Sequence, residues 1–486
     1  MGFDKNFFWG GSIAANQYEG SWNIDGRGMT KSDVLTSGSV NSSRKITFRK
    51  NDGTFGWMEE DDSLPEGCEY AVAPGQFYPN HDAVKGYEHI EDDIALFAEM
   101  GFSMFRLSIS WARLFPTGIE DSPNEDGIRY YHKVFSACKK NGIEPLVTLL
   151  HFDTPLHLIK NGGWLKRDIL PYFHRFVETC FKEYRDEVKY WITINEINTA
   201  VCFLPDEAPD SQWKDALVTL HHQFLASADA VITGHKINSN NLIGCMIAGE
   251  TAYPYSCNPK DILLNRHKWE EKIFYCGDVH CFGEYSPFAE RIWEKHNVHI
   301  EITQDDKKIL KDGTMDMYTF SYYYSTVVTA SQTAKKIEGD HVSGIMNPYL
   351  EYSKWNWAID PMGLQYYLET IFDRYRKPVM IVENGLGEIE ELEDGCIHDS
   401  YRIKYLGTHI QSTKKAVENG VNLLGYLMWS PIDIVSAGTG EMRKRYGLIY
   451  VDADDAGNGT FSRTKKDSFD WYKKVIESNG ERLGCK

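Results

Sequence analysis

Short apolar runs alternate along the chain with longer stretches of helical periodicity. We interpret eight of the runs as strands: Phe7–Ala15, Met104–Ser110, Pro145–His151, Tyr190–Glu196, Leu242–Ala248, Met317–Tyr323, Pro378–Glu383 and Leu423–Trp429. Several of them are almost continuously apolar. This is typical of a parallel sheet that is covered by helices.

Between these runs, apolar residues recur at intervals of three and four positions. One such series predicts a helix that ends at Gly101, because glycine commonly terminates helices; its members are Val84, Tyr87, Ile90, Ile94 and Phe97. A second series predicts a helix before Asn141 and Gly142; its members are Tyr130, Val134, Phe135 and Cys138.

Eight strand–helix units predict an α/β fold, a single (β/α)8 TIM barrel with long βα loops. The competing architecture is a doubly wound open sheet. That architecture usually has fewer strands and often a glycine-rich first turn, which this sequence lacks. No linker or low-complexity stretch divides the chain, so we predict one domain over residues 1–486.

Residues Thr36–His81 interrupt the alternation. The stretch is polar and rich in glycine, serine and asparagine, with a charge run at Glu59–Asp62. Two interpretations stay open: a long βα loop over the mouth of the barrel, or a surface insertion without a role.

Composition excludes several classes of protein. The 486 residues are 42% hydrophobic and 13% aromatic, which is enough for a large core, and the formal net charge is −18. This acidity argues against a nucleic-acid partner, and no apolar run approaches the roughly 20 residues that span a bilayer, so no membrane partner is expected. The oligomeric state stays open, with a homo-oligomer as one alternative.

The cysteines and the first residues predict a cytoplasmic location. The segment Met1–Lys5 has neither a basic nor an apolar signal region, so no secretory signal is expected. The ten cysteines include no Cys-x-x-Cys motif, and a chain of 486 residues does not need disulfides. We therefore expect reduced thiols, and neither the cysteine spacing nor a histidine pair suggests a metal site.

Polar residues gather where the predicted strands end, which in a barrel is one face of the molecule. They include Gln17, Glu19, Arg106, His151, Asp153, Asn195, Glu196, Tyr323, Glu383, Asn384, Trp429 and Ser430. Glu196 and Glu383 directly follow apolar strands, where a carboxylate is costly to desolvate. Such a glutamate can serve a structural ion pair. Two that converge on one cavity are the minimum equipment for cleaving a glycosidic bond.

The motifs taken in order resemble those of glycoside hydrolase family 1, the retaining β-glycosidases, over essentially the whole chain. The segments that carry the resemblance are Phe8–Gly10, Gln17–Gly20, Phe105–Trp111, Leu150–Pro155, Thr193–Glu196, Ile381–Gly385 and Met428–Ser430. The resemblance implies that Glu196 is the general acid/base and Glu383 the nucleophile. It also implies that Arg106 and Tyr323 keep Glu383 ionised and oriented.

The same resemblance implies a set of sugar-binding residues: Gln17, His151, Asn195, Trp357 and Trp429. Asn195 would bind the sugar 2-hydroxyl, Trp429 would lie against the apolar sugar face, and Trp357 would support the leaving group. For His151, Trp357 and Trp429, ordinary core packing is the alternative interpretation.

The segment after the eighth strand resembles the phosphate-binding set of the 6-phospho-β-glucosidase branch. Ser436 stands where members that cleave neutral glucosides typically carry a glutamate, which would repel a phosphate dianion. Lys444 and Tyr446 follow, and a lysine charge with two neutral donors makes a sensible phosphate site. The alternative is that Arg443–Arg445 is a solvated basic run. Ala437, where phospho-galactosidases tend to carry tryptophan, favours a gluco-configured sugar.

Three positions depart from the family pattern. Ile197 replaces a common proline, Ser321 replaces a frequent asparagine, and Phe152 replaces a more usual tryptophan or tyrosine. We interpret them as marks of the phospho-specific branch, although they weaken the transfer of roles around Tyr323.

The resemblance thus implies a retaining 6-phospho-β-glucosidase without cofactor or metal. Its partner would be a small phosphorylated β-glucoside, such as cellobiose 6-phosphate or an aryl β-glucoside 6-phosphate, cleaved to glucose 6-phosphate and an aglycone. The alternatives are a β-glucosidase or β-galactosidase acting on neutral sugars, a 6-phospho-β-galactosidase, and a catalytically dead protein that binds sugar phosphates. The preferred aglycone stays open.

Overall fold

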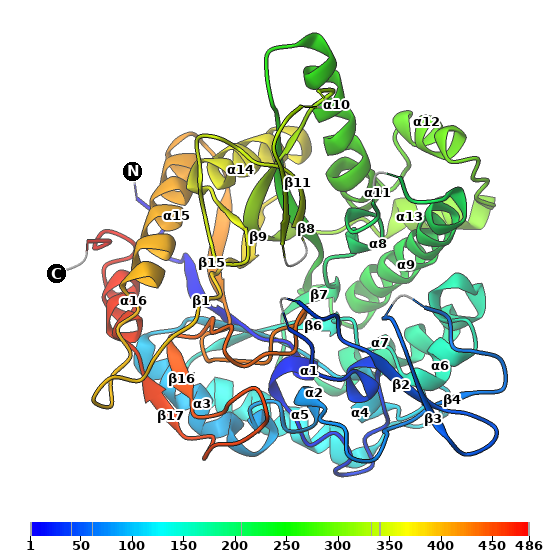
Figure 1. The fold of residues 1–486 in the computed structure, drawn as a ribbon, viewed down its shortest axis with the longest axis horizontal. Coiled ribbons are helices and arrows are strands. Elements are labelled where there is room, and N and C mark those ends of the chain that lie inside the picture. Colours follow the sequence, from blue (N-terminus) through cyan, green and yellow to red (C-terminus); the bar gives the residue numbers. More distant parts are fainter. Residues whose placement is uncertain are drawn as a thin grey trace.

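Eight parallel strands form a closed barrel at the centre of the computed structural model, which describes residues 2–39, 41–60, 62–205, 207–331, 333–339 and 342–484 (Figure 1). In spatial order the barrel strands are β1 (Phe8–Ser12), β15 (Leu423–Trp429), β14 (Val379–Glu383), β9 (Met317–Val328), β8 (Leu242–Pro254), β7 (Tyr190–Ile194), β6 (Glu144–Leu150) and β5 (Met104–Ser108). Strand β1 pairs in parallel with both β15 and β5, which closes the ring. All eight predicted strands are confirmed, and the open doubly wound sheet is excluded.

Helices surround the barrel, and the longer ones follow the strands in the order of the chain. They are α3 (Gly86–Met100), α5 (Glu125–Lys140), α7 (Leu170–Glu183), α9 (Asp210–Ile237), α10 (Pro259–Trp269), α11 (Tyr275–Phe282), α12 (Phe288–Lys295), α13 (Gln304–Asp312), α14 (Pro361–Tyr375), α15 (Ser400–Glu418) and α16 (Asp467–Glu477). The predicted stop of α3 is confirmed, because Gly101 caps it with a left-handed backbone (φ of 97°). Helix α5 ends immediately before Asn141, also as predicted.

Short elements lie in the loops between strands and helices. The helical ones are α1 (Ala15–Tyr18), η1 (Lys31–Val34), α2 (Pro79–Asp82), α4 (Trp111–Leu114), α6 (Leu156–Lys160), η2 (Gly163–Leu165), η3 (Arg167–Ile169), α8 (Thr199–Cys202) and the π-helical turn η4 (Glu270–Phe274). Three two-stranded sheets pair β10 (Lys336–Gly339) with β11 (Val342–Ile345), β12 (Glu351–Tyr352) with β13 (Ala358–Ile359), and β16 (Ile449–Val451) with β17 (Arg463–Lys465).

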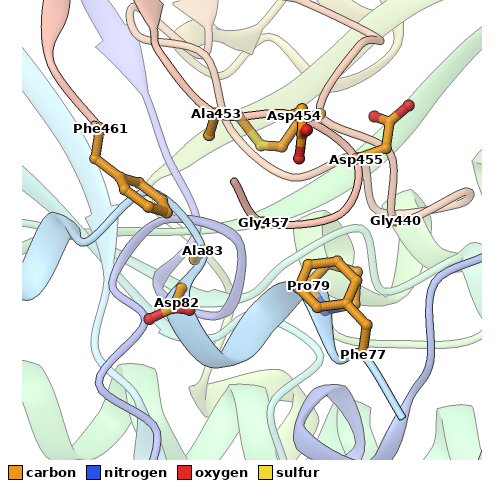
Figure 2. A pocket seen from close by; sticks show the side chains of 11 residues that line it. Phe77, Pro79, Asp82, Ala83, Gly440, Ala453, Asp454, Asp455, Gly457 and Phe461 are labelled. Atoms are coloured by element: carbon orange, nitrogen blue, oxygen red, sulfur yellow. The ribbon is translucent and has the colours of Figure 1, made fainter. Parts of the chain in front are cut away.

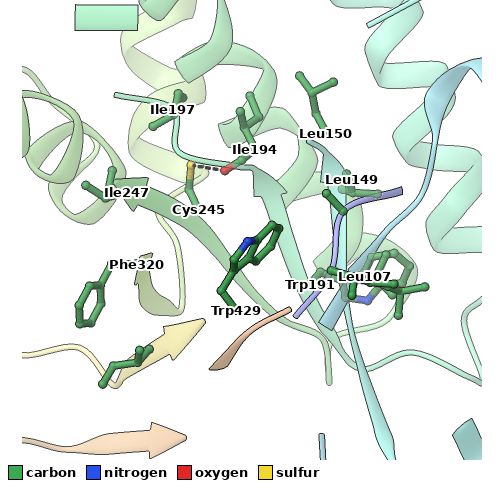
Figure 3. Close-up of a cluster of buried hydrophobic side chains, with 14 of the residues drawn as sticks. Leu107, Leu149, Leu150, Trp191, Ile194, Ile197, Cys245, Ile247, Phe320 and Trp429 are labelled. Carbon is green, nitrogen blue, oxygen red and sulfur yellow. Dashed lines mark hydrogen bonds between the residues drawn. The ribbon is translucent and has the colours of Figure 1, made fainter. Parts of the chain in front are cut away.

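Two separate apolar clusters hold the barrel together. Inside it, a small cluster takes one or two side chains from seven of the strands: Met104, Leu146, Ile192, Met246, Met317, Met380, Val382 and Leu427. The larger cluster includes barrel residues that pack toward the surrounding helices, and Figure 3 shows part of it, with the Cys245 thiol 3.5 Å from the carbonyl of Ile194. Gly10 has a steric reason for being glycine, because a Cβ there would lie 1.8 Å from the carbonyl oxygen of Met104. The barrel interior is therefore packed rather than hollow, which leaves the strand ends for chemistry.

The stretch from Thr36 to His81 is more ordered than the expected loop. It contains a three-stranded antiparallel sheet in the order β3 (Phe55–Met58), β2 (Ile46–Arg49) and β4 (Glu69–Tyr70). A satellite apolar cluster that includes Ile46, Phe48 and Met58 supports this sheet. Gly38 and Arg44 hydrogen-bond to the loop that follows β15, so the stretch packs against the mouth of the barrel. Of the two open interpretations, the contacts favour the loop over the mouth.

Candidate active site

Glu196 and Glu383 face the same end of strand β9. Ser321 Oγ lies 2.5 Å from Glu196 Oε1, and Tyr323 Oη donates a hydrogen bond to Glu383 Oε2 at 2.7 Å. Ser321 is also the register partner of Glu383 across the β9–β14 ladder. Because side chains two residues apart on a strand share one face, the two carboxyl groups lie on the same face of β9.

The two carboxyl groups have different environments. Burial, and after it the charge of Glu383, raise the pKa of Glu196 from 4.5 to about 8. Burial also raises the pKa of Glu383, but Arg106 and Tyr323 oppose that effect. Glu383 forms an ion pair with Arg106, whereas Glu196 has only the Ser321 hydroxyl. The protonated form is therefore favoured at Glu196, whereas the ion pair with Arg106 and the Tyr323 hydrogen bond favour the carboxylate form of Glu383.

Arg106 connects three strand ends. It is fully buried on β5, and it pairs with Glu383 through Nη1, donates to Asn195 Oδ1 from Nη2 at 2.5 Å, and donates to Thr148 Oγ1 from Nε at 2.9 Å. The Nδ2 group of Asn195 is buried without a hydrogen-bond partner among the described residues. An unpaired buried donor of this kind is suited to a substrate hydroxyl.

Backbone strain is concentrated where the strands end. Phe152, Glu196 and Ser430 follow β6, β7 and β15, and their φ angles are 63°, 40° and 61°. The left-handed region costs a residue with a Cβ on the order of 1 kcal/mol or more, and such residues cluster at functional sites. The surrounding structure therefore holds these three residues in a backbone conformation that non-glycine residues otherwise avoid.

The residues expected to bind sugar line the same mouth. His151 stacks on Trp429 with ring centroids 6.0 Å apart and an interplanar angle of 26°. Burial lowers the pKa of His151 well below its usual value, so the ring is neutral, and its Nδ1 has no partner among the described residues. Gln17 Nε2 donates to the carbonyl of Val435 at 2.8 Å, and the Trp357 ring lies 5.4 Å from that of Tyr323.

Lys444 is not part of a solvated basic run. Its side chain is buried, and its Nζ lies 4.3 Å from the ring centroid of Trp357, 5.1 Å from that of Trp355 and 5.6 Å from that of Tyr446. Of its neighbours, Arg445 is buried and pairs with Asp433, and only Arg443 is largely exposed. Ser436, also buried, lies in the turn that follows Val435.

A buried guanidinium holds the segment that carries Lys444 and Tyr446. Arg402 on α15 donates to the carbonyl oxygens of Tyr446 at 2.7 Å, Arg445 at 3.1 Å and Leu386 at 2.6 Å. Leu386 belongs to the loop after β14, which also carries Glu383. The nucleophile candidate and the phosphate-site candidates therefore share one support.

The twelve site residues predicted from the sequence all lie on barrel strands or in the segments that follow them. Sequence reasoning missed others that support them: Thr148, Trp355, Arg402 and Glu441. Ser321 was recognised only as a departure from a pattern, and its hydrogen bond to Glu196 gives it a place in the site. Its position two residues before Tyr323 on a strand is the signal that could have indicated this.

Neither a membrane-spanning helix nor a metal site is found among the described residues. No helix among them is long and apolar enough to cross a membrane. Within the same ranges, no group of three or more histidine, cysteine, aspartate or glutamate side chains could hold a metal ion. Nine cysteines of the described part of the chain are free thiols.

The class of protein follows from comparison with known families. The sequence profile of glycosyl hydrolase family 1 matches residues 1–52 and 74–481, so the chain belongs to that family. The unmatched stretch, residues 53–73, contains β3 and β4.

Individual relatives are similar over their full length. The chain is 44% identical over 500 residues to the aryl-phospho-β-D-glucosidase BglA of Bacillus subtilis (strain 168), covering 99% of each protein. It is 43% identical over 490 residues to the 6-phospho-β-glucosidase AscB of Escherichia coli (strain K12), again covering 99% of each. Among solved structures, the family 1 β-glucosidase from Thermotoga maritima superposes with a TM-score of 0.80 at 26% identity, over 98% of both chains.

Proposed function

We propose that this protein is a retaining glycosidase that hydrolyses 6-phospho-β-D-glucosides to glucose 6-phosphate and an aglycone by double displacement. Membership of glycosyl hydrolase family 1 and the names of the two full-length relatives support the reaction and the phosphorylated substrate. Aryl β-glucoside 6-phosphates and cellobiose 6-phosphate are the substrates we expect it to take.

One observation carries the proposal: a buried lysine beside the acidic pair. Lys444 lies against Trp357, whose ring neighbours Tyr323, the hydrogen-bond donor to Glu383. The Lys444 ammonium brings a positive charge to the site, and a sugar phosphate, which carries two negative charges, is a ligand that matches it. We assign Ser436 and Tyr446 as the neutral donors that complete the phosphate site.

In the first step, the ionised Glu383 attacks the anomeric carbon while Glu196 gives its proton to the departing glycosidic oxygen. This forms a covalent glycosyl ester and releases the aglycone. The ester removes the charge of Glu383, so the pKa of Glu196 falls and Glu196 becomes a general base. In the second step, Glu196 takes a proton from water, the water oxygen attacks the anomeric carbon, and Glu383 leaves as a carboxylate.

The neighbouring side chains have defined parts in this proposal. Arg106 and Tyr323 keep Glu383 ionised and oriented by charge-assisted hydrogen bonds. Asn195 donates its unpaired Nδ2 to the sugar 2-hydroxyl, an interaction that strengthens in an oxocarbenium-like transition state. Gln17 and the neutral His151 bind other ring hydroxyls, Trp429 supports the sugar face, and Trp357 supports the leaving group.

The test compares kcat/KM on p-nitrophenyl β-D-glucoside with and without a 6-phosphate. We expect the phosphorylated compound to be preferred by about 100-fold or more, because several charge-assisted bonds depend on the phosphate. A preference for the neutral compound would refute the phosphate site, and turnover of neither would favour a binding protein. The galacto-configured 6-phosphate tests the preference that we infer from Ala437.

We also infer that residues 1–486 form one catalytic unit. Its partner is a small phosphorylated sugar, and we expect no nucleic-acid partner. A sugar phosphate dianion does not cross a lipid bilayer unaided, so we place the enzyme where such sugars are formed, in the cytoplasm. Cell fractionation with an antibody against the protein tests this location.

A further inference from the structure

Arg44 is a buried cation whose hydrogen-bond partners are all uncharged. It lies just before β2, and its guanidinium donates to the carbonyls of Thr36 at 2.9 Å, Ala437 at 3.0 Å and Leu35 at 3.3 Å, and to Asn80 Oδ1 at 2.6 Å. No carboxylate among the described residues forms an ion pair with it. Burial lowers the pKa of Arg44 to about 10, against the opposing effect of the Glu60 charge, so Arg44 remains charged at neutral pH. Glu60 itself pairs with Lys31, so Arg44 is a buried charge without a directly bonded counter-ion among the described residues, which is costly and indicates a use for it.

The Ala437 carbonyl belongs to the turn that carries Ser436. The turn is closed by hydrogen bonds from Ser436 N to Glu441 O at 3.1 Å and from Gly440 N to Ser436 O at 2.9 Å. Arg44 holds it at Ala437, and the amide of Gly38 holds it at the Thr439 carbonyl, 2.9 Å away. A Cβ at Gly440 would lie 3.1 Å from Arg44 Nε, so the guanidinium packs directly on the turn. The guanidinium therefore lies against the backbone of the turn that carries Ser436.

The turn has little room to move away from the substrate side. Next to Gly440 lies a cavity of only about 10 Å³, which holds at most one water molecule. Figure 2 shows Pro79, Ala83 and Phe461 among the residues that line it. Because α2 contributes Pro79, the Thr36–His81 stretch supports the turn here as well as at Arg44.

The acidic groups near the turn form no ion pair with Arg44. Glu441 lies 3.6 Å from Arg443, and burial raises the pKa of Glu441, which favours its uncharged form. Asp455, which lines the small cavity, pairs with Arg443. Arg44 therefore brings a positive charge to the turn that carries Ser436.

We propose that Arg44 is a positioning and specificity-determining residue for the 6-phosphate group: it holds the Ser436 turn and places a positive charge behind it. This inference rests on the proposed function. It also gives the Thr36–His81 stretch a role, because β2 next to Arg44 is flanked by β3 and β4. Both of those strands lie in the residues 53–73 that the family profile does not match.

The test measures the ratio of kcat/KM on p-nitrophenyl β-D-glucoside 6-phosphate to kcat/KM on the unphosphorylated glucoside. In Arg44→Gln we expect this ratio to fall about tenfold or more, through a higher KM for the phosphorylated substrate, with kcat/KM on the neutral one changed less than threefold. Arg44→Lys keeps the charge without the forked geometry, so it should retain part of the preference. The ratio is independent of the folded fraction, so partial unfolding of a variant does not affect it.

Arg49→Gln is the matched control. Arg49 lies on β2 in the same stretch, but it is exposed and pairs with Glu69, so its loss should leave the ratio unchanged. If Arg44→Gln keeps the full preference for the phosphate, or loses both activities equally, Arg44 has only a structural role and this inference is wrong while the proposed function stands. If the parent enzyme itself prefers the neutral glucoside, the proposed function fails and this inference fails with it.

Discussion

The raised pKa of Glu196 has two causes that a single substitution separates. Burial is the larger cause and the charge of Glu383 the second. Glu383→Gln removes the charge and leaves the burial almost unchanged. The pKa of Glu196 should then fall from about 8, but not to the ordinary value of 4.5.

The size of this fall follows from the separation of the two carboxyl groups, which the retaining mechanism requires to be about 5 Å. Two unit charges at that separation interact by about 3 kcal/mol at an effective dielectric constant of about 20. This corresponds to a change of about 2 in pKa. We therefore expect a pKa of about 6 for Glu196 in the variant.

The assay is a ¹³C NMR titration of protein labelled at the glutamate carboxyl carbons. The resonance that is absent from Glu196→Gln identifies the group, and Glu69→Gln, which changes an exposed carboxyl, serves as the control. A pKa that stays at about 8 in Glu383→Gln would refute the charge coupling on which the two-step mechanism depends. A fall to 4.5 would contradict burial as the larger cause.

Three further variants test the site. Glu383→Gly should abolish hydrolysis, and added azide should restore turnover with an α-glycosyl azide as product, identified by NMR; without rescue the nucleophile assignment fails. Ser436→Glu should lower kcat/KM on the phosphorylated glucoside about 50-fold or more and on the neutral one only a few-fold, because a carboxylate there repels the dianion; equal losses would count against a phosphate contact. Glu196→Gln tests stability: burial raises the folded-state pKa from 4.5 to about 8, so the stability from the protonated group is present below pH 4.5 and is lost as pH rises through 8. The gain in Tm of this variant over the parent, measured by calorimetry, should therefore be larger at pH 8 than at pH 5. An equal gain at the two pH values would contradict a raised pKa for Glu196.

The fold was predictable because each barrel strand has a local signal. Apolar runs such as that of β14 are buried on both faces, and Gly101 ends α3 by a backbone conformation that glycine adopts easily. Strands β8 and β9 run on to Pro254 and Val328, beyond the predicted limits, because they continue to pair with each other past the barrel. Pairing between strands distant in sequence has no local signal.

Some residues of the candidate site could likewise be predicted from the sequence, and others could not. Residues at strand ends, such as Glu196 and Glu383, could be found because chain order places them on one face of a barrel. Arg44 and Arg402 could not, since each acts by donating to carbonyl oxygens that any residue provides. Arg44 and Ala437 are separated by 393 positions, and nothing in either side chain indicates the contact.

Strand β9 provides a hydrogen-bond donor to each carboxyl group, so the position of this strand affects the alignment of both the acid and the nucleophile. A change that shifts β9 along its axis should slow formation and breakdown of the covalent ester together. A change confined to the Ser321 hydroxyl should alter the two rates unequally. The ratio of the rate of ester formation to the rate of ester breakdown therefore shows whether a remote substitution has moved this strand. An unchanged ratio with both rates lowered indicates that β9 has shifted.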